Sequence, residues 1–134
     1  MRKTVQIVLG AVFATVLGTG IAQAADYKYP SEKDCGEQGF AKDNLTKGAC
    51  VVVIRTKGNC MTCHQMQGLS SGNVATPLMN VKGRYAGEDG KKRLRIQIEN
   101  PHIANKESVM PPFGRNGILS KDEISHLVDF LLTI

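Results

Sequence analysis

The chain has 134 residues, of which 42% are hydrophobic and only 5% aromatic, with no tryptophan. This length suits one small domain, and the scarcity of aromatic residues leaves an aliphatic core of modest size. Seventeen basic residues stand against twelve acidic ones, a net charge of +5. Without Arg2 and Lys3 at the start of the chain the excess falls to +3. A charge of that size is too mild to indicate a nucleic-acid-binding or membrane-binding protein, but it permits electrostatic steering toward an acidic protein partner.

The first 24 residues have the pattern of a secretory signal peptide. Arg2 and Lys3 form a positive start, an apolar run follows over residues 5–21, and Ala22-Gln23-Ala24 supplies the cleavage pattern. We therefore expect residues 1–24 to be removed on export to the periplasm, which leaves fifteen basic and twelve acidic residues in the mature chain. The alternative is an uncleaved membrane anchor, because the apolar run is nearly long enough to span a bilayer.

Residues 25–42 are polar and rich in turn residues, and they predict an extended N-terminal segment. Export would place the chain in an oxidising compartment, where an even pair of spare cysteines forms a disulfide. Cys35 and Cys50 are such a pair, and we expect them to bond within the chain. The alternatives are a bridge to a partner subunit or a reactive thiol.

We expect the main domain to span residues 43–134 and to open with a helix over residues 43–55. Apolar residues recur there at helical spacing, and Asp43 or Asn44 is a suitable N-cap. The β-branched run at residues 51–54 favours a strand locally. Because the helical pattern continues toward the next motif, helix is the prediction.

The next motif is Cys60-Met61-Thr62-Cys63-His64, the C-x-x-C-H attachment sequence of a c-type haem. On the first turn of a helix, Cys60 and Cys63 can both form thioethers with one porphyrin, and His64 brings its imidazole to the iron. One alternative is a CxxC redox pair with an incidental histidine. Another is a zinc site, for which only Cys35 and Cys50 offer further cysteine ligands.

A polar loop over residues 65–73 is expected to pass around the haem edge. A proximal histidine needs its second ring nitrogen held by a backbone acceptor, which fixes the tautomer. The carbonyl of Pro77, about a dozen residues after His64, is the predicted acceptor, and an ordinary loop proline is the alternative. Further on, residues 91–99 fit either a helix or a strand, with an end at Asn100-Pro101.

Met110 stands before Pro111 and Pro112, which hold the backbone in an extended conformation. Such a segment can present a thioether sulfur to the sixth position of the iron, so Met110 is the predicted distal ligand. Met79 is the competing methionine, and His102 or His126 would give a bis-histidine haem.

The last stretch predicts an amphipathic helix. Ser120-Lys121-Asp122-Glu123 is a capping box, with acidic residues in the first turn to suit the helix dipole. The predicted apolar face, which would pack on the earlier helix, consists of Ile124, Leu127, Val128, Leu131 and Leu132.

Together these features resemble a class I cytochrome c and, more closely, the SoxX family, the monohaem subunits of the SoxAX complex. The closer resemblance is carried by Lys57 to Gln65, Gly83-Arg84-Tyr85, Leu94-Arg95 with Ile98, Asn100-Pro101, Met110 to Arg115 and Leu119 to Leu132. It implies an all-α fold around one covalent haem c, attached at Cys60 and Cys63 and ligated by His64 and Met110. One departure is Thr76, where class I cytochromes usually have glycine.

SoxX-like subunits bind a SoxA-like cytochrome, and the pair oxidatively couples thiosulfate to a cysteine of the SoxYZ carrier. The resemblance therefore implies an electron-transfer subunit of a thiosulfate-oxidising enzyme that passes electrons to a small cytochrome c. No substrate chemistry is expected on this chain, because an iron ligated by histidine and methionine has no open position. The alternatives are a free-standing class I electron carrier, or a haem sensor or peroxidase with a vacant sixth site.

Overall fold

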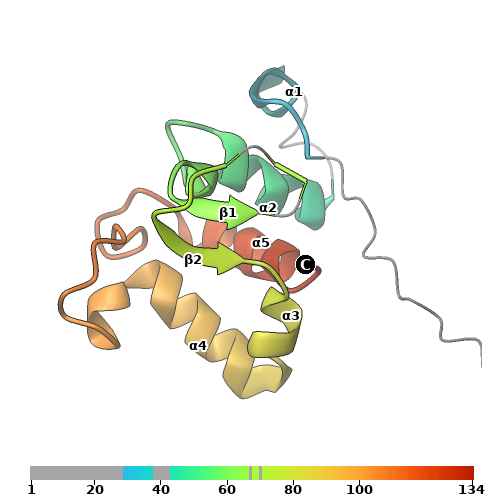
Figure 1. The fold of residues 1–134 in the computed structure, drawn as a ribbon. Helices are drawn as coiled ribbons and strands as arrows, with labels where there is room; N and C mark the ends of the chain where they lie inside the picture. The colour runs from blue at the N-terminus through green and yellow to red at the C-terminus, as the bar shows by residue number, and fades with distance from the viewer. Residues whose placement is uncertain (1–28, 38–42, 67, 70) are drawn as a thin grey trace, which may run out of the picture.

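The computed structural model describes residues 29–37, 43–66, 68–69 and 71–134 (Figure 1). The predicted signal peptide and residues 25–28 and 38–42 of the predicted extension lie outside the described residues. The elements, with η marking 3₁₀ helices, are α1 (Glu32–Glu37), α2 (Asn44–Val53), η2 (Cys60–Thr62), β1 (His64–Met66), β2 (Ala75–Leu78), α3 (Val81–Arg84), α4 (Gly87–Glu99), η3 (Pro101–Ile103) and α5 (Lys121–Leu131). In Figure 1, α2 and α5 lie behind the two strands, with α1 above and α4 below.

Helix α2 begins at the N-cap that the sequence predicts. The Asp43 carboxylate accepts hydrogen bonds from the backbone N–H groups of Leu45 and Thr46, both at 3.0 Å, which satisfies two of the unpaired donors at a helix start. Every residue from Gly48 to Val53 is buried. Burial within the core therefore overrides the strand preference of the β-branched run, and the predicted helix is confirmed.

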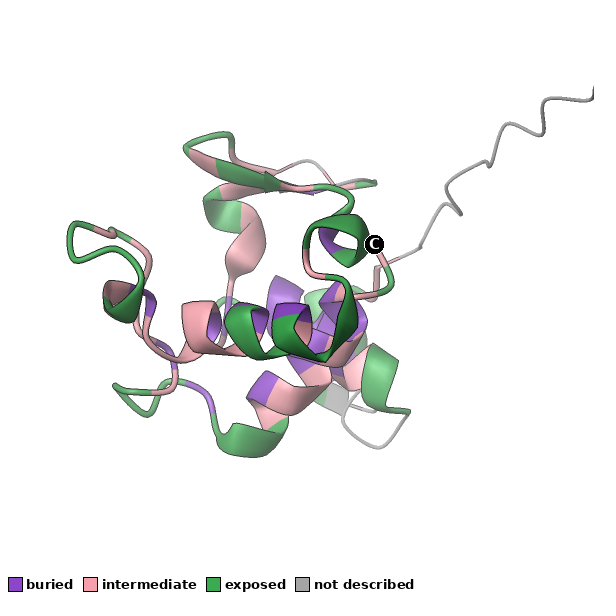
Figure 2. Cartoon of the chain, turned by 90° about the horizontal axis from the view of Figure 1, so that it is seen from below, coloured by how far each residue is buried: buried purple, intermediate pink, exposed green. Residues whose placement is uncertain are grey.

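Helix α5 packs against α2 and forms the other half of the core, where the buried residues gather in Figure 2. Its capping box is confirmed: Ser120 Oγ accepts from the Glu123 N–H at 3.2 Å, and the Glu123 carboxylate accepts from the Ser120 N–H at 2.8 Å. The buried face differs from the prediction at one position, since Phe130 is fully buried and Leu132 is only half-buried.

The two helices approach closely at Gly48. A Cβ atom there would collide with the carbonyl oxygen of His126 and would lie 2.6 Å from the Cβ of Phe130. Protein interiors are close-packed, so any larger residue would push the helices apart or distort them. Glycine at this position therefore sets the spacing between α2 and α5.

The structure contains two short strands that the predicted all-α fold does not include. β1 and β2 pair in parallel, with His64 opposite Ala75 and Met66 opposite Leu78. The Ala75 N–H also donates to the Cys63 carbonyl at 3.0 Å, so the chain returns directly beside the C-x-x-C-H turn. Strands of three and four residues leave no periodicity to recognise in a sequence, and the fold is therefore mostly helical with one small sheet.

The N-terminal segment is helical at residues 32–37, and the prediction of an extended conformation there is wrong. Ser31 Oγ accepts from the Asp34 N–H at 3.2 Å, and the Asp34 carboxylate accepts from the Ser31 N–H at 3.1 Å. These two bonds form a capping box, for which Ser-x-x-Asp is the sequence signal. The turn residues of this segment led us to predict an extended conformation, and the capping box was overlooked.

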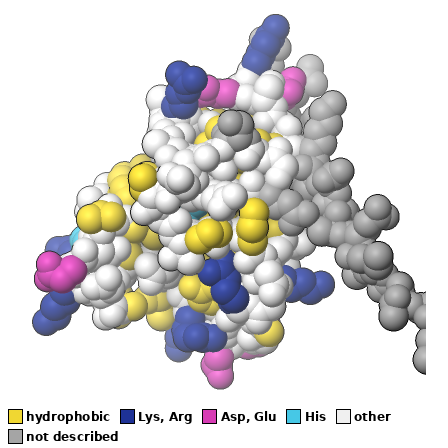
Figure 3. All heavy atoms as spheres, in the orientation of Figure 1, with side chains coloured by type: hydrophobic (Ala, Val, Ile, Leu, Met, Phe, Trp, Pro, Cys, Tyr) yellow, Lys and Arg dark blue, Asp and Glu magenta, His cyan; other side chains and the backbone are white. Residues whose placement is uncertain are grey.

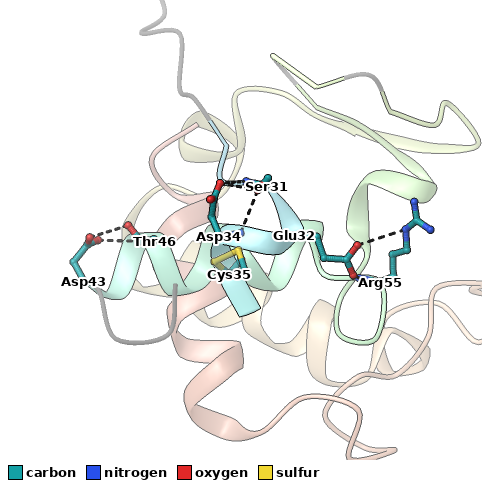
Figure 4. Close-up of a disulfide and its surroundings, with 8 residues drawn as sticks. Ser31, Glu32, Asp34, Cys35, Asp43, Thr46 and Arg55 are labelled. Atoms are coloured by element: carbon teal, nitrogen blue, oxygen red, sulfur yellow. Dashed lines mark hydrogen bonds and ion pairs between the residues drawn. A yellow bond between two sulfur atoms is a disulfide. The ribbon is translucent and has the colours of Figure 1, made fainter. Parts of the chain in front are cut away.

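A disulfide joins α1 to α2 (Figure 4). Cys35 and Cys50 are bonded, with their Cα atoms 5.5 Å apart and both side chains buried, which confirms the predicted pairing. A carboxylate adds a second link, because Glu32 accepts a hydrogen bond from the Arg55 N–H at 3.1 Å. The segment before the main domain is therefore fixed at two points, one in the C-terminal half of α2 and one just after it, close to the C-x-x-C-H turn.

Residues 91–99, which fit either a helix or a strand by sequence, belong to α4. Its buried residues are Gly90, Leu94 and Ile98, the four-residue spacing of a helix face. Asn100 ends the helix, as predicted, and Pro101 opens η3. None of the helices within the described ranges has the length and apolar character needed to cross a membrane.

We expect Gly48→Ala to lower the free energy of unfolding by about 1–3 kcal/mol, the usual cost of overpacking a core. Gly36→Ala is the matched control, because a Cβ at Gly36 in α1 meets nothing within 4 Å, and it should leave stability unchanged or slightly higher. Denaturant unfolding of both purified variants measures the difference. Equal stabilities would contradict the close crossing of α2 and α5.

Candidate functional site

A cavity of about 880 Å³ opens between η2, β2, α4 and the segment before α5. This volume lies within the range of pockets that bind cofactors and other small molecules. Apolar side chains from four separate parts of the chain line it: Leu78, Leu94, Phe113 and Leu127. On the face shown in Figure 3, apolar side chains gather near the strands, and Lys and Arg side chains lie over α3 and α4.

The cavity wall contains the four side chains that the sequence analysis expects around a haem. Cys60, Cys63 and His64 come from one turn, and Met110 comes from the loop after η3. The chain folds so that these two segments, far apart in sequence, line the same space.

The turn that carries the cysteines is a 3₁₀ helix, where the first turn of an α-helix was expected. Asn59 precedes it in the left-handed conformation, with φ of 46°, and the Cys63 N–H donates to the Cys60 carbonyl at 3.3 Å. Gly58 allows the turn to pack on the end of α2, because a Cβ there would lie 2.6 Å from the Val51 carbonyl and 3.1 Å from Cys60 Sγ.

The two cysteines lie in different surroundings. Cys63 is exposed, whereas Cys60 is half-buried. Burial of the Cys60 sulfur raises the pKa of its thiol to about 12, since desolvation disfavours the charged form. The free Cys60 thiol therefore stays protonated at neutral pH.

His64 is held by the backbone of β2. Its Nδ1 atom lies 2.7 Å from the Thr76 carbonyl oxygen. A carbonyl oxygen can only accept a hydrogen bond, so Nδ1 is the donor, and in the neutral imidazole Nε2 is then the nitrogen with the lone pair. That tautomer is the one in which Nε2 can ligate a metal ion.

The structure corrects the prediction for Pro77. The acceptor of the His64 hydrogen bond is Thr76, one residue earlier, and the Pro77 carbonyl accepts from Arg84 Nη2 at 2.7 Å instead. Carbonyls of successive strand residues point in opposite directions, so only one of the two can face the histidine. The sequence analysis assigned neither of these hydrogen-bonding roles to Thr76 or Arg84. Thr76 also lies about a dozen residues after His64, so the expected spacing could not separate it from Pro77.

Met110 is the methionine that reaches the cavity. Among the described residues, no other methionine lines its wall, and neither His102 nor His126 does. Met79, the competing methionine of the sequence analysis, is 41% exposed and lies away from the wall. The structure therefore places Met110 on the same cavity wall as the C-x-x-C-H residues. Met79, His102 and His126, the alternative ligands, are not on that wall.

An ion pair joins the start of the turn to α5. Lys57 Nζ lies 2.7 Å from the Glu123 carboxylate. Burial raises the pKa of Glu123, but the hydrogen bond from Lys57 and the capping bonds with Ser120 outweigh it and leave that pKa below its ordinary value of 4.5. Glu123 is therefore ionised at neutral pH and holds the turn against the core.

The residues on the wall fit haem c by their chemistry. Two thiols spaced C-x-x-C can form its thioether bonds, an imidazole with a free Nε2 can ligate its iron, and a thioether sulfur can supply the second axial ligand. Apolar walls suit the faces of a porphyrin, which is mostly hydrocarbon. The site therefore fits a covalently attached, six-coordinate haem.

Comparison with protein families gives a match to the chain from the end of α2 onward. The family model described as cytochrome c matches residues 53–134, a range that begins at the end of α2 and contains every residue of the cavity wall. A search of curated proteins finds no match.

We expect Glu123→Gln to reduce stability by up to about 1 kcal/mol at pH 7. Glutamine keeps the capping box but removes the charge that pairs with Lys57. A carboxylate whose pKa is lowered on folding stabilises the protein above its ordinary pKa of 4.5 and loses that contribution as the pH falls through the lowered value. The difference between wild type and variant should therefore disappear in acid.

Asp122→Asn is the matched control for that comparison. Asp122 lies in the same first turn of α5 but is exposed, and it forms no ion pair within the described part of the chain. Urea unfolding at pH 7 and at pH 3 separates the two effects. An equal loss in both variants would mean that the helix dipole, and not Lys57, accounts for the stabilisation by Glu123.

Proposed function

Since this chain belongs to the cytochrome c family, we propose that its cavity holds the haem c at Cys60 and Cys63, with His64 and Met110 as axial ligands. Membership of the family makes the chain a haem c electron-transfer protein, with the haem covalently attached. The observation that supports the proposed ligand set is that Met110 and the C-x-x-C-H residues line one cavity.

Each residue has a separate task in this proposal. The Cys60 and Cys63 sulfurs form the thioether bonds, and Thr76 orients His64 through its carbonyl so that Nε2 faces the iron. Met110 occupies the sixth position, which leaves no site for a substrate. The bound haem supplies a one-electron iron couple, and the apolar walls limit the access of water to it.

We propose further that the protein is the electron-transfer subunit of a SoxAX-type complex in the periplasm. The support is the resemblance of its motifs to the SoxX family, together with the signal-peptide pattern of residues 1–24. In this role the chain would bind a SoxA-like cytochrome, which couples thiosulfate to a cysteine of a SoxYZ-like carrier, and would pass electrons to a small cytochrome c. The second candidate is a free-standing class I electron carrier.

We expect Met110→Ala to abolish the sulfur-to-iron charge-transfer band of the ferric protein and to lower its reduction potential, because a thioether ligand favours ferrous iron. The reduced variant should also bind carbon monoxide at neutral pH, whereas the wild type should not. Met79→Ala is the matched control, since Met79 lies away from the cavity wall. Carbon monoxide binding by the wild type would favour a sensor or peroxidase instead.

The partner proposal predicts that the holoprotein co-purifies with a SoxA-like cytochrome from periplasmic extract. Thiosulfate-dependent reduction of a small cytochrome c should then require both proteins and a SoxYZ-like carrier, with no activity when this chain is omitted. A monomer that exchanges electrons with cytochromes but adds nothing to thiosulfate oxidation would support the free-standing carrier.

A further inference from the structure

We infer that His102 is a positioning residue for Met110 and acts on it through Ser108. The inference rests on the proposed function, because it takes Met110 to be the iron ligand. His102 itself does not line the cavity, whereas Ser108 and Met110 do. Its effect must therefore pass through the loop that separates it from the site.

The first link is a hydrogen bond that spans six residues. His102 lies in η3, directly after the buried Pro101, and its Nε2 atom is 3.0 Å from the Ser108 carbonyl oxygen. That oxygen can only accept, so Nε2 donates. The half-buried imidazole therefore connects η3, which follows α4, to the far end of the loop.

The second link joins the same serine to the methionine. The Met110 backbone N–H donates to Ser108 Oγ at 3.2 Å. Ser108 thus accepts one hydrogen bond from His102 through its carbonyl and one from Met110 through its hydroxyl. Together the two bonds fix the backbone of Met110 relative to η3.

The loop has little else to hold it in the core. Five of the six residues from 104 to 109 are exposed, and Val109 is 96% exposed. The loop is shaped by local turns instead, with the Asn105 N–H donating to the Pro101 carbonyl at 3.0 Å and the Ser108 N–H to the Asn105 carbonyl at 3.1 Å. The His102 bond differs from these turns, because it ties the last part of the loop, beside Met110, to η3.

Loss of this bond should weaken the iron–methionine bond without removing the ligand. A loop held in its bound conformation loses less entropy when its methionine binds the iron, so the bound state is favoured. One hydrogen bond typically shifts such an equilibrium by about two- to ten-fold. A competing ligand should report the shift directly, because it can bind the iron only after Met110 leaves.

The test is a titration of the ferric holoprotein with imidazole, followed by loss of the sulfur-to-iron charge-transfer band. We expect His102→Phe to raise the apparent imidazole affinity by about two- to ten-fold. His102→Gln should stay near wild type, because the glutamine amide can still donate to the Ser108 carbonyl. His126→Phe is the matched control, since His126 belongs to α5 and does not line the cavity.

Ser108→Ala tests the second link, between Ser108 and Met110, and it keeps the inference falsifiable if His102→Phe does not yield folded protein. It removes the hydroxyl acceptor of the Met110 N–H and should raise imidazole affinity by a similar factor. A wild-type affinity in His102→Phe, or in Ser108→Ala where only that variant folds, would overturn the inference. If Met110→Ala keeps the charge-transfer band, the proposed ligand set fails and the inference fails with it. If Met110→Ala loses the band but His102→Phe keeps the wild-type imidazole affinity, only the inference about His102 fails.

Discussion

The close crossing of α2 and α5 at Gly48 is the constraint on which the rest of the structure depends. Helix α2 leads into the turn of Cys60 and Cys63, and α5 supplies Leu127 and Leu131 to the cavity wall. The spacing of the two helices therefore decides where the attachment turn lies relative to the apolar wall. The Lys57–Glu123 ion pair joins the same turn to the start of α5, and the disulfide fixes α1 to α2. The ion pair and the position of the attachment turn would both change if the two helices moved apart.

The two proposed axial ligands, His64 and Met110, are held in different ways. The main chain holds His64, through the pairing of β1 with β2 and the carbonyl of Thr76. Side chains hold the Met110 loop, which is otherwise exposed. A backbone acceptor is present whatever the side chain, so the histidine side of the site should tolerate substitution better than the methionine side. Changes in reduction potential by mutation are therefore expected to arise mainly from the loop before Met110.

Sequence reasoning succeeded where the signal is local or chemically rare. The C-x-x-C-H motif, the Ser120 capping box and the Asp43 N-cap each have a short pattern with a physical meaning. The Cys35–Cys50 pairing followed from the number of cysteines and the expected compartment.

It failed where position depends on contacts between distant segments. The strands are too short to show a period, and the choice of the Thr76 carbonyl over that of Pro77 depends on which way the backbone of β2 faces. The relation between His102 and Met110 also has no pattern in the sequence, because it passes through the conformation of an exposed loop. The helix at residues 32–37 is a different case, since its capping box was present in the sequence and was overlooked.

Near-infrared magnetic circular dichroism of the ferric holoprotein at neutral pH tests the central claim most directly, because the position of its charge-transfer band distinguishes the axial ligand pairs of low-spin haem. A single low-spin species with the band of histidine–methionine ligation is the predicted result. A bis-histidine spectrum would contradict the assignment of Met110 as the second ligand. A high-spin haem with a vacant or water-filled sixth position would contradict both that assignment and the proposal that this cavity serves electron transfer alone.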